Sequence, residues 1–174
     1  MTEAVTDAVS DADRSSVQRQ LGREPRGMVA VAHRCSCGEP DVVTTAPRLP
    51  GGEPFPTVYY LTCPRITSAV STLEAEGRMR EMQDRLAVDV DLAERYARAH
   101  VRYLDDRAAL DHVPEIEGVS AGGMPDRVKC LHVLVGHALA SGPGVNPFGD
   151  EALAEIEQRD LVRGLTCVQR SAEA

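Results

Sequence analysis

The sequence predicts an α+β fold, in which a small antiparallel sheet of N-terminal strands packs against a layer of three to four helices. Two observations predict this class. Segments rich in β-branched and apolar residues lie in the first third of the chain, whereas the remainder carries apolar residues at helical spacing. Because the strands come first and the helices follow, the chain lacks the β-α-β alternation that builds parallel sheets.

Three strands are expected. Residues 27–34 (GMVAVAHR) and 41–45 (DVVTT) flank a tight turn at residues 35–38 (CSCG), so they are predicted to form a hairpin. Residues 57–62 (TVYYLT) are predicted to be the third strand. Residues 46–56 carry four Pro and two Gly, too many for regular structure, and are therefore predicted to form a loop.

The remaining elements are predicted to be helices, because apolar residues recur at intervals of three and four. A short helix is expected within residues 15–21, ended by Gly22. Gly77 is expected to end or kink the first main helix, whose apolar stripe continues to Leu86. The predicted main helices are residues 64–77, 89–111, 125 or 126 to about 140, and 151–165.

The length of 174 residues fits one domain, predicted to span residues 14–165. Residues 1–13 are small, polar and acidic, and we expect them to be a disordered tail. Residues 166–174 are expected to be a frayed C-terminal tail.

The formal charge of −8 argues against general nucleic-acid binding, which depends on neutralising phosphates with Lys and Arg. Residues 14–34 are nevertheless locally basic, with five Arg against one Glu. No stretch approaches the roughly 20 apolar residues of a membrane helix, and the N-terminus lacks a signal pattern. We therefore expect a cytoplasmic protein whose odd number of Cys stays reduced.

Three blocks carry a resemblance to a known family: QLGREPRG followed by VAHRC, then PFPTVYYLTCP, then GMPDRVKCLHVLVGHALASGPGVNPFGD. From about residue 17 to residue 155 the chain resembles the uncharacterised bacterial family called domain of unknown function 501. Members are often encoded near an enolase, a small septum-initiator-like protein and an exopolyphosphatase. This resemblance implies a link to cell division, the envelope or polyphosphate metabolism, without an established activity.

A metal site is the leading prediction for the functional residues. Cys130, His132 and His137 fall within eight residues of one another, and Cys35 and Cys63 stand at the ends of predicted strands. The family pattern keeps Cys at 35 and 130 and His at 132 and 137, with Cys63 in many members. Zinc prefers four thiolate or imidazole ligands in a tetrahedron, which three of these Cys and one His would supply.

The spacing leaves the choice of His open. In a continuous helix, His137 lies roughly 10 Å along the axis from Cys130, and His132 points about 200° away from it. Either the helix begins after Cys130 or only part of the trio binds metal. An iron–sulfur cluster on Cys35, Cys37, Cys63 and Cys130 is less consistent, since their spacing matches no standard motif. Compared with the family pattern, we interpret Cys37 as a local addition, and we expect Cys167, in the C-terminal tail, to be incidental.

An alternative chemistry uses Cys130 as a nucleophile, because a helix N-terminus and nearby cations favour the thiolate. His132 or His137 would then be the acid or base, which makes Cys130 and His137 candidate catalytic residues. The substrate would be a phosphate-bearing anion, bound by the three cations Arg34, Arg127 and Lys129.

Three classes of function follow. We expect a binding or regulatory module with a Cys/His zinc site, acting on an unknown protein partner or a small anionic ligand. The alternative is an enzyme using Cys130 on a phosphate-bearing molecule. The third is a purely structural partner in a division-linked assembly, in which the Cys and His residues are core residues. The sequence does not predict the oligomeric state.

Overall fold

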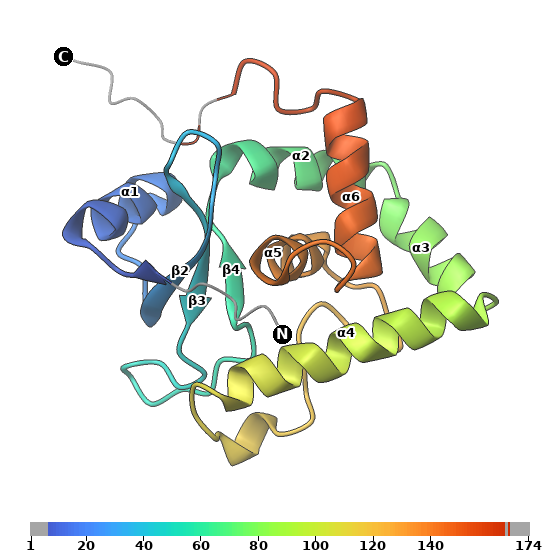
Figure 1. Ribbon diagram of the computed structural model, residues 1–174, viewed down its shortest axis with the longest axis horizontal. Coiled ribbons are helices and arrows are strands. Elements are labelled where there is room, and N and C mark those ends of the chain that lie inside the picture. Colours follow the sequence, from blue (N-terminus) through green and yellow to red (C-terminus); the bar gives the residue numbers. More distant parts are fainter. Residues whose placement is uncertain (1–6, 166, 168–174) are drawn as a thin grey trace.

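The computed structural model describes residues 7–165 and Cys167, and it confirms the α+β class. The strands in this part of the chain form one antiparallel sheet in the order β1-β2-β3-β4 (Figure 1). Both the predicted hairpin and the predicted third strand are present, and a two-residue strand that was not predicted pairs with β2. The strands are β1 (Asp7–Ala8), β2 (Met28–Arg34), β3 (Pro40–Thr45) and β4 (Tyr59–Leu61).

Helices cover both faces of the sheet (Figure 1). One helix, α1, covers one face alone, and α5 packs on the other face, where α2, α4 and α6 surround it. Gly77, with a φ of 87°, separates α2 from α3, so the long predicted stripe is two helices. The helical elements of the described chain are α1 (Asp11–Leu21), α2 (Pro64–Ala75), α3 (Arg78–Leu86), α4 (Val90–Ala108), the short 3-10 turn η1 (Pro114–Ile116), α5 (Leu131–Ser141) and α6 (Pro147–Gln158).

Helix α1 begins inside the acidic segment that we expected to be disordered. The Ser10 side chain accepts a hydrogen bond from the Asp13 backbone N–H, and the Asp13 carboxylate accepts one from the Ser10 N–H. This reciprocal cap satisfies donors that a helix N-terminus otherwise leaves free, and it explains why residues 7–13 differ from the expectation. Residues 1–6, and residues 166–174 apart from Cys167, lie outside the described residues.

Helix α5 begins at Leu131, five or six residues later than predicted, with Cys130 at its N-cap. Side chains of other elements bind the backbone of the preceding segment, so the i→i−4 hydrogen bond from the Arg127 N–H to the Gly123 carbonyl is not continued into α5. The Val128 N–H donates to the Gln83 side chain at 2.9 Å, and the Leu131 N–H donates to Glu74 Oε1 at 2.7 Å. Of the two alternatives left open by the spacing, the helix that begins after Cys130 is the one observed.

Helix α6 begins earlier than predicted. Asn146 caps it by accepting the Gly149 N–H at 3.0 Å, and Pro147 takes the first helical position, where its missing N–H is harmless. The expected turn at residues 146–150 is thus the first turn of this helix. The helix also ends at Gln158, before the predicted Leu165.

The main apolar core lies between the sheet and the helices on the α5 side. Two glycines bring its elements close together. A Cβ at Gly136 of α5 would stand 3.2 Å from the Tyr59 carbonyl oxygen of β4, and one at Gly149 of α6 would overlap the Leu134 carbonyl oxygen. Among the described helices, none combines the length and the apolar character that a membrane span requires.

Candidate functional site

Three cysteines from distant parts of the chain meet in one cluster. The sulfur atoms of Cys35, Cys37 and Cys167 all lie within 4.8 Å of one another, and the Cys35 and Cys167 sulfurs are 3.3 Å apart. Cys63 is fully buried and close enough to Cys167 to be among the groups that raise the pKa of that thiol. We call these four residues the cysteine cluster.

Each member of the cysteine cluster is held by the end of an element. Cys35 and Cys37 lie in the tight turn between β2 and β3, which is closed by a 2.8 Å bond from the Gly38 N–H to the Cys35 carbonyl. Cys63 is the N-cap of α2. The chain leaving α6 returns toward this turn, where it contributes Cys167 (Figure 1).

The charges around the cluster favour thiolates. The Arg65 guanidinium lies 3.8 Å from the Cys35 sulfur and 3.6 Å from the Cys167 sulfur. Burial raises the pKa of Cys35, but the backbone and thiol of Cys37 and the thiol of Cys167 outweigh burial, so the net shift is downward. Burial and the neighbouring thiols raise the pKa of Cys167. Of these two thiols, Cys35 therefore loses its proton more readily than Cys167.

This cluster fits a tetrahedral metal ion. Zinc binds thiolate sulfur at about 2.3 Å, which places the ligand sulfurs of a tetrahedral site about 3.8 Å apart. Three of its sulfurs, those of Cys35, Cys37 and Cys167, already lie within 4.8 Å of one another, whereas the Cys63 sulfur is not part of that group. Four thiolates on a divalent cation leave two negative charges, and the neighbouring Arg65 offsets one of them.

A second group of metal-capable side chains stands apart from the first. Glu74 of α2, Cys130 and His132 of α5 place one donor atom each within 4.8 Å of the others. His132 Nδ1 is 3.3 Å from Glu74 Oε1, and His132 Nε2 is 3.2 Å from the Thr67 carbonyl oxygen. Cys130 and His132 also line a pocket of about 540 Å³ at the edge of β4.

His137 belongs to neither group. Its side chain is fully buried on the core side of α5, where its ring stacks on Tyr59 and meets Tyr103 edge-on. Its Nδ1 lies 3.2 Å from the Asn146 side-chain nitrogen, which donates to it. Burial lowers the pKa of His137 to about 3, so the ring is neutral near pH 7. These contacts are those of a core histidine.

The structure therefore divides the five predicted metal ligands. It places Cys35 and Cys63 each beside Cys167, places Cys130 beside His132 in a second group, and keeps His137 in the core. Cys37 and Cys167, which had been set aside, instead join Cys35. The Cys-x-Cys pair in a tight turn could have indicated that Cys37 belongs to the site. No sequence pattern indicated that Cys167, near the other end of the chain, would lie beside Cys35.

The three predicted anion-binding cations do not gather at Cys130. Arg34 pairs with Asp13 at 2.7 Å, and its guanidinium also donates to the Gly38 carbonyl. Arg127 and Lys129 are exposed in the segment before α5. None of these three residues lines the Cys130 pocket.

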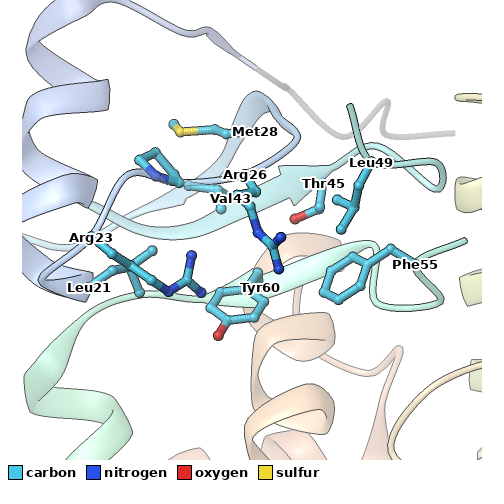
Figure 2. A pocket seen from close by; sticks show the side chains of 10 residues that line it. Leu21, Arg23, Arg26, Met28, Val43, Thr45, Leu49, Phe55 and Tyr60 are labelled. Atoms are coloured by element: carbon cyan, nitrogen blue, oxygen red, sulfur yellow. The ribbon is translucent and has the colours of Figure 1, made fainter. Parts of the chain in front are cut away.

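Two arginines that were not predicted face a different pocket. Figure 2 shows the guanidinium groups of Arg23 and Arg26 turned toward the Tyr60 ring, with Phe55 beside them. This cavity of about 130 Å³ lies on the α1 side of the sheet, and we call it the arginine pocket. The basic composition of residues 14–34 was the available signal, although it did not identify which arginines meet.

The fold and its sites define an α+β domain that carries the cysteine cluster, the Cys130 pocket and the arginine pocket. Residues 31–154, more than half of the chain, match the family model described as a protein of unknown function (DUF501). The chain therefore belongs to this family, as the resemblance of its motifs predicted. No match was found among curated proteins or among solved structures.

Proposed function

We propose that this protein is a binding module held together by zinc, with Cys35, Cys37, Cys63 and Cys167 as the metal ligands. The observation that carries the proposal is the convergence of three sulfurs within 4.8 Å, with buried Cys63 beside them. The closed set of four thiolates leaves no position for a substrate, which is typical of structural rather than catalytic zinc.

The metal would join three segments that are far apart in the sequence. It would hold the β2–β3 turn, the start of α2 and the chain after α6 at one point. Binding energy at such a site stabilises the folded state directly, because the unfolded chain does not present the ligands together. The five free thiols suit a reducing compartment, and we place the protein in the cytoplasm for that reason.

The arginine pocket is the ligand-binding site of the module in this proposal. Arg23 and Arg26 supply positive charge beside the Tyr60 ring, with the Phe55 ring in the same pocket. A small anion with an apolar or aromatic body would bind both features, since guanidinium groups pair with carboxylates and phosphates in a fork geometry. An anionic ligand is also compatible with the link to polyphosphate metabolism that the neighbouring genes of the family suggest, which stays a prediction.

Metal content tests the proposal. Protein purified under reducing conditions is expected to carry one equivalent of zinc by elemental analysis, and Cys35→Ser and Cys167→Ser are expected to lose it. Cys130→Ser is the matched control, because it removes a partly buried thiol outside the cluster and should keep the metal.

Three results would contradict the proposal. Metal-free protein with a Cys35–Cys167 disulfide would identify a redox pair instead. Iron with a visible chromophore would indicate a cluster cofactor. Zinc lost from Cys130→Ser, but retained by Cys35→Ser, would move the metal to the second group.

A further inference from the structure

The Cys130 pocket is a separate chemical site that the proposed metal does not use. It opens where β4, the end of α1, the start of α2 and the start of α5 come together. Its volume of about 540 Å³ is large enough for a small organic molecule. Cys130 and His132 lie in its wall together with hydroxyl, amide and apolar side chains.

The hydrogen bonds of His132 indicate its protonation state. Nδ1 faces a carboxylate oxygen of Glu74, and Nε2 faces the carbonyl oxygen of Thr67. Both of these oxygens can only accept hydrogen bonds, whereas the Ser71 hydroxyl, 3.3 Å from Nε2, can either donate or accept. The two acceptors favour a ring with a proton on each nitrogen. Such an imidazolium would have no lone pair for a metal.

Glu74 and Thr67 are therefore positioning residues for His132. Glu74 Oε1 also accepts the Leu131 N–H at 2.7 Å, which fixes the carboxylate on the first turn of α5. The His132 side chain is 27% exposed and the Glu74 side chain is 23% exposed, so water weakens this pair only in part. Cys130, His132 and Glu74 place one donor atom each within 4.8 Å of the others, and a thiol, an imidazole and a carboxylate are the residue types used by cysteine nucleophiles.

Cys130 stands where a thiolate is stabilised. It occupies the N-cap of α5, so its sulfur lies near the positive end of the helix dipole. Burial raises the pKa of Cys130, but the side chain of His132 and the backbone N–H of Val133 act against burial, and the net shift is downward. The same contact with Cys130, together with Glu74, raises the pKa of His132. Both shifts favour the charged forms of the two groups, a thiolate beside an imidazolium.

We propose that Cys130 and His132 form a catalytic centre for acyl transfer, acting on an ester or thioester whose acyl group enters the Cys130 pocket. The lining selects this class of substrate. Among the described residues of its wall, neither Lys nor Arg is present, so the pocket offers a phosphate no fixed cation besides His132, whose charge is already paired with Glu74. Apolar side chains such as Leu21, Leu61 and Val133 suit an uncharged acyl chain instead.

The chemical step balances with the groups present and water as the co-substrate. The Cys130 thiolate forms a bond to the carbonyl carbon, and the bond from that carbon to the leaving oxygen or sulfur breaks. The leaving group takes the proton of His132 and departs as an alcohol or thiol. Water then attacks the thioester carbonyl carbon and gives one of its protons to His132. The bond from that carbon to the Cys130 sulfur breaks, which releases the carboxylic acid and restores the thiolate.

An uncharged ester provides the test. Zinc-loaded protein is treated with p-nitrophenyl acetate, and the acetylated residue is identified by peptide mass spectrometry while nitrophenol release is followed. We expect a burst of nitrophenol and acetyl on Cys130, with no burst in Cys130→Ser. In His132→Gln the rate of acetylation is expected to fall by roughly 100-fold, as for loss of an acid–base partner.

A second measurement separates catalysis from a folding defect. The rate of alkylation of Cys130 by iodoacetamide against pH reports the ionisation of its thiol. The inflection is expected below the usual value of about 8.5 and should move upward in both His132→Gln and Glu74→Gln. Unchanged zinc content and circular dichroism in each variant would establish that the fold persists.

Two results would overturn the inference: acetylation that falls mainly on the exposed Cys37, or a Cys130 inflection that is the same in wild type and His132→Gln. Zinc bound in place of reactivity at Cys130 would also overturn it. The zinc site of the cysteine cluster shares no residue with this centre, so either proposal can fail while the other stands.

Discussion

The sulfur atoms of Cys35 and Cys167 lie 3.3 Å apart although the two residues are 132 positions apart in the sequence. This contact closes nearly the whole described domain into one loop. A cross-link over so long a loop removes much conformational freedom from the unfolded chain, which stabilises the folded state. The contact is too long for a disulfide, whose sulfurs are about 2.05 Å apart, and close to the spacing of two thiolates on one metal.

Removing the metal is expected to destabilise the domain. A cross-link that closes a loop of this length contributes about 3 to 5 kcal/mol, and the zinc site should contribute on that scale. For a chain of this size, a loss of about 3 kcal/mol lowers Tm by about 10 °C. Thermal unfolding followed by circular dichroism, before and after treatment with a strong chelator under reducing conditions, measures the change.

The matched variants make this measurement specific. Cys167→Ser should unfold at the lower temperature in both conditions, because the chelator has nothing further to remove. Cys130→Ser should respond to the chelator as the wild type does. A Cys167→Ser protein that still loses stability on chelation would place the metal elsewhere.

The arginine pocket is expected to bind an aromatic anion. Replacing both Arg23 and Arg26 by Gln removes the two guanidinium groups that face Tyr60, while the apolar walls remain. Each charge-assisted hydrogen bond is worth about 1.5 to 3 kcal/mol, so affinity for an arylsulfonate dye should fall at least about tenfold. Fluorescence titration gives the dissociation constants.

Arg19 supplies the control for this prediction. It belongs to the last turn of α1 and is absent from the described lining of the pocket. Arg19→Gln therefore removes one positive charge, as each of the two pocket substitutions does, but leaves the pocket lining unchanged. Dye affinity that falls as much in Arg19→Gln would indicate a general charge effect rather than a specific pocket.

The ion pair between Asp13 and Arg34 links α1 to β2 and should make stability depend on acid pH. The Arg34 guanidinium, at 2.7 Å, holds the pKa of Asp13 well below its usual value. A carboxyl whose folded pKa is depressed contributes stability above its unfolded pKa, and that contribution disappears as the pH falls below about 4. Since Arg34 is one-third exposed, we expect the contribution to be about 1 kcal/mol.

Urea unfolding at pH 7 and pH 3 tests this pair. Asp13→Asn should be less stable than wild type at pH 7, and the difference should shrink at pH 3. Asp11→Asn is the control, because Asp11 lies in the same first turn but is exposed. The assignment fails if the two variants lose the same stability at pH 7.

Local sequence patterns predicted most of the helices and strands, whereas tertiary contacts determine where these elements begin and end. The spacing of apolar residues located α4 to within a few residues, and β-branched segments located β2, β3 and β4. The predicted start of α5 was wrong because Gln83 of α3 and Glu74 of α2 bind the backbone before it. No local pattern reports such contacts.

The candidate sites were predicted by residue type but not by grouping. The sequence identified Cys35, Cys63, Cys130 and His132 as special, and the structure places each in a cluster of reactive groups. It could not divide them into two sites, because that division depends on which segments meet at the β2–β3 turn and which meet along the edge of β4. Cys167 shows the same limit, since its partner lies at the opposite end of the chain.

His137 is expected to make the fold sensitive to mild acid. Burial lowers its pKa from the usual 6.5 to about 3, with Arg102 adding a repulsive charge. The unfolded chain therefore binds a proton below about pH 6.5 that the folded chain does not, so stability falls as the pH drops from about 6.5 toward 3. Between pH 6.5 and pH 5 this amounts to about 2 kcal/mol.

His137→Phe removes the titrating group and keeps a ring between Tyr59 and Tyr103, at the cost of the contact with Asn146. It is expected to be less stable at pH 7, yet its unfolding free energy should change less between pH 7 and pH 5 than that of wild type. Exposed His112, replaced by Gln, should leave the full pH dependence. Because His33 and His132 titrate in every one of these proteins, their contributions cancel in the comparison. An equal pH dependence in His137→Phe and wild type would mean that His137 is protonated in the folded protein, and its assignment as a neutral core residue would be wrong.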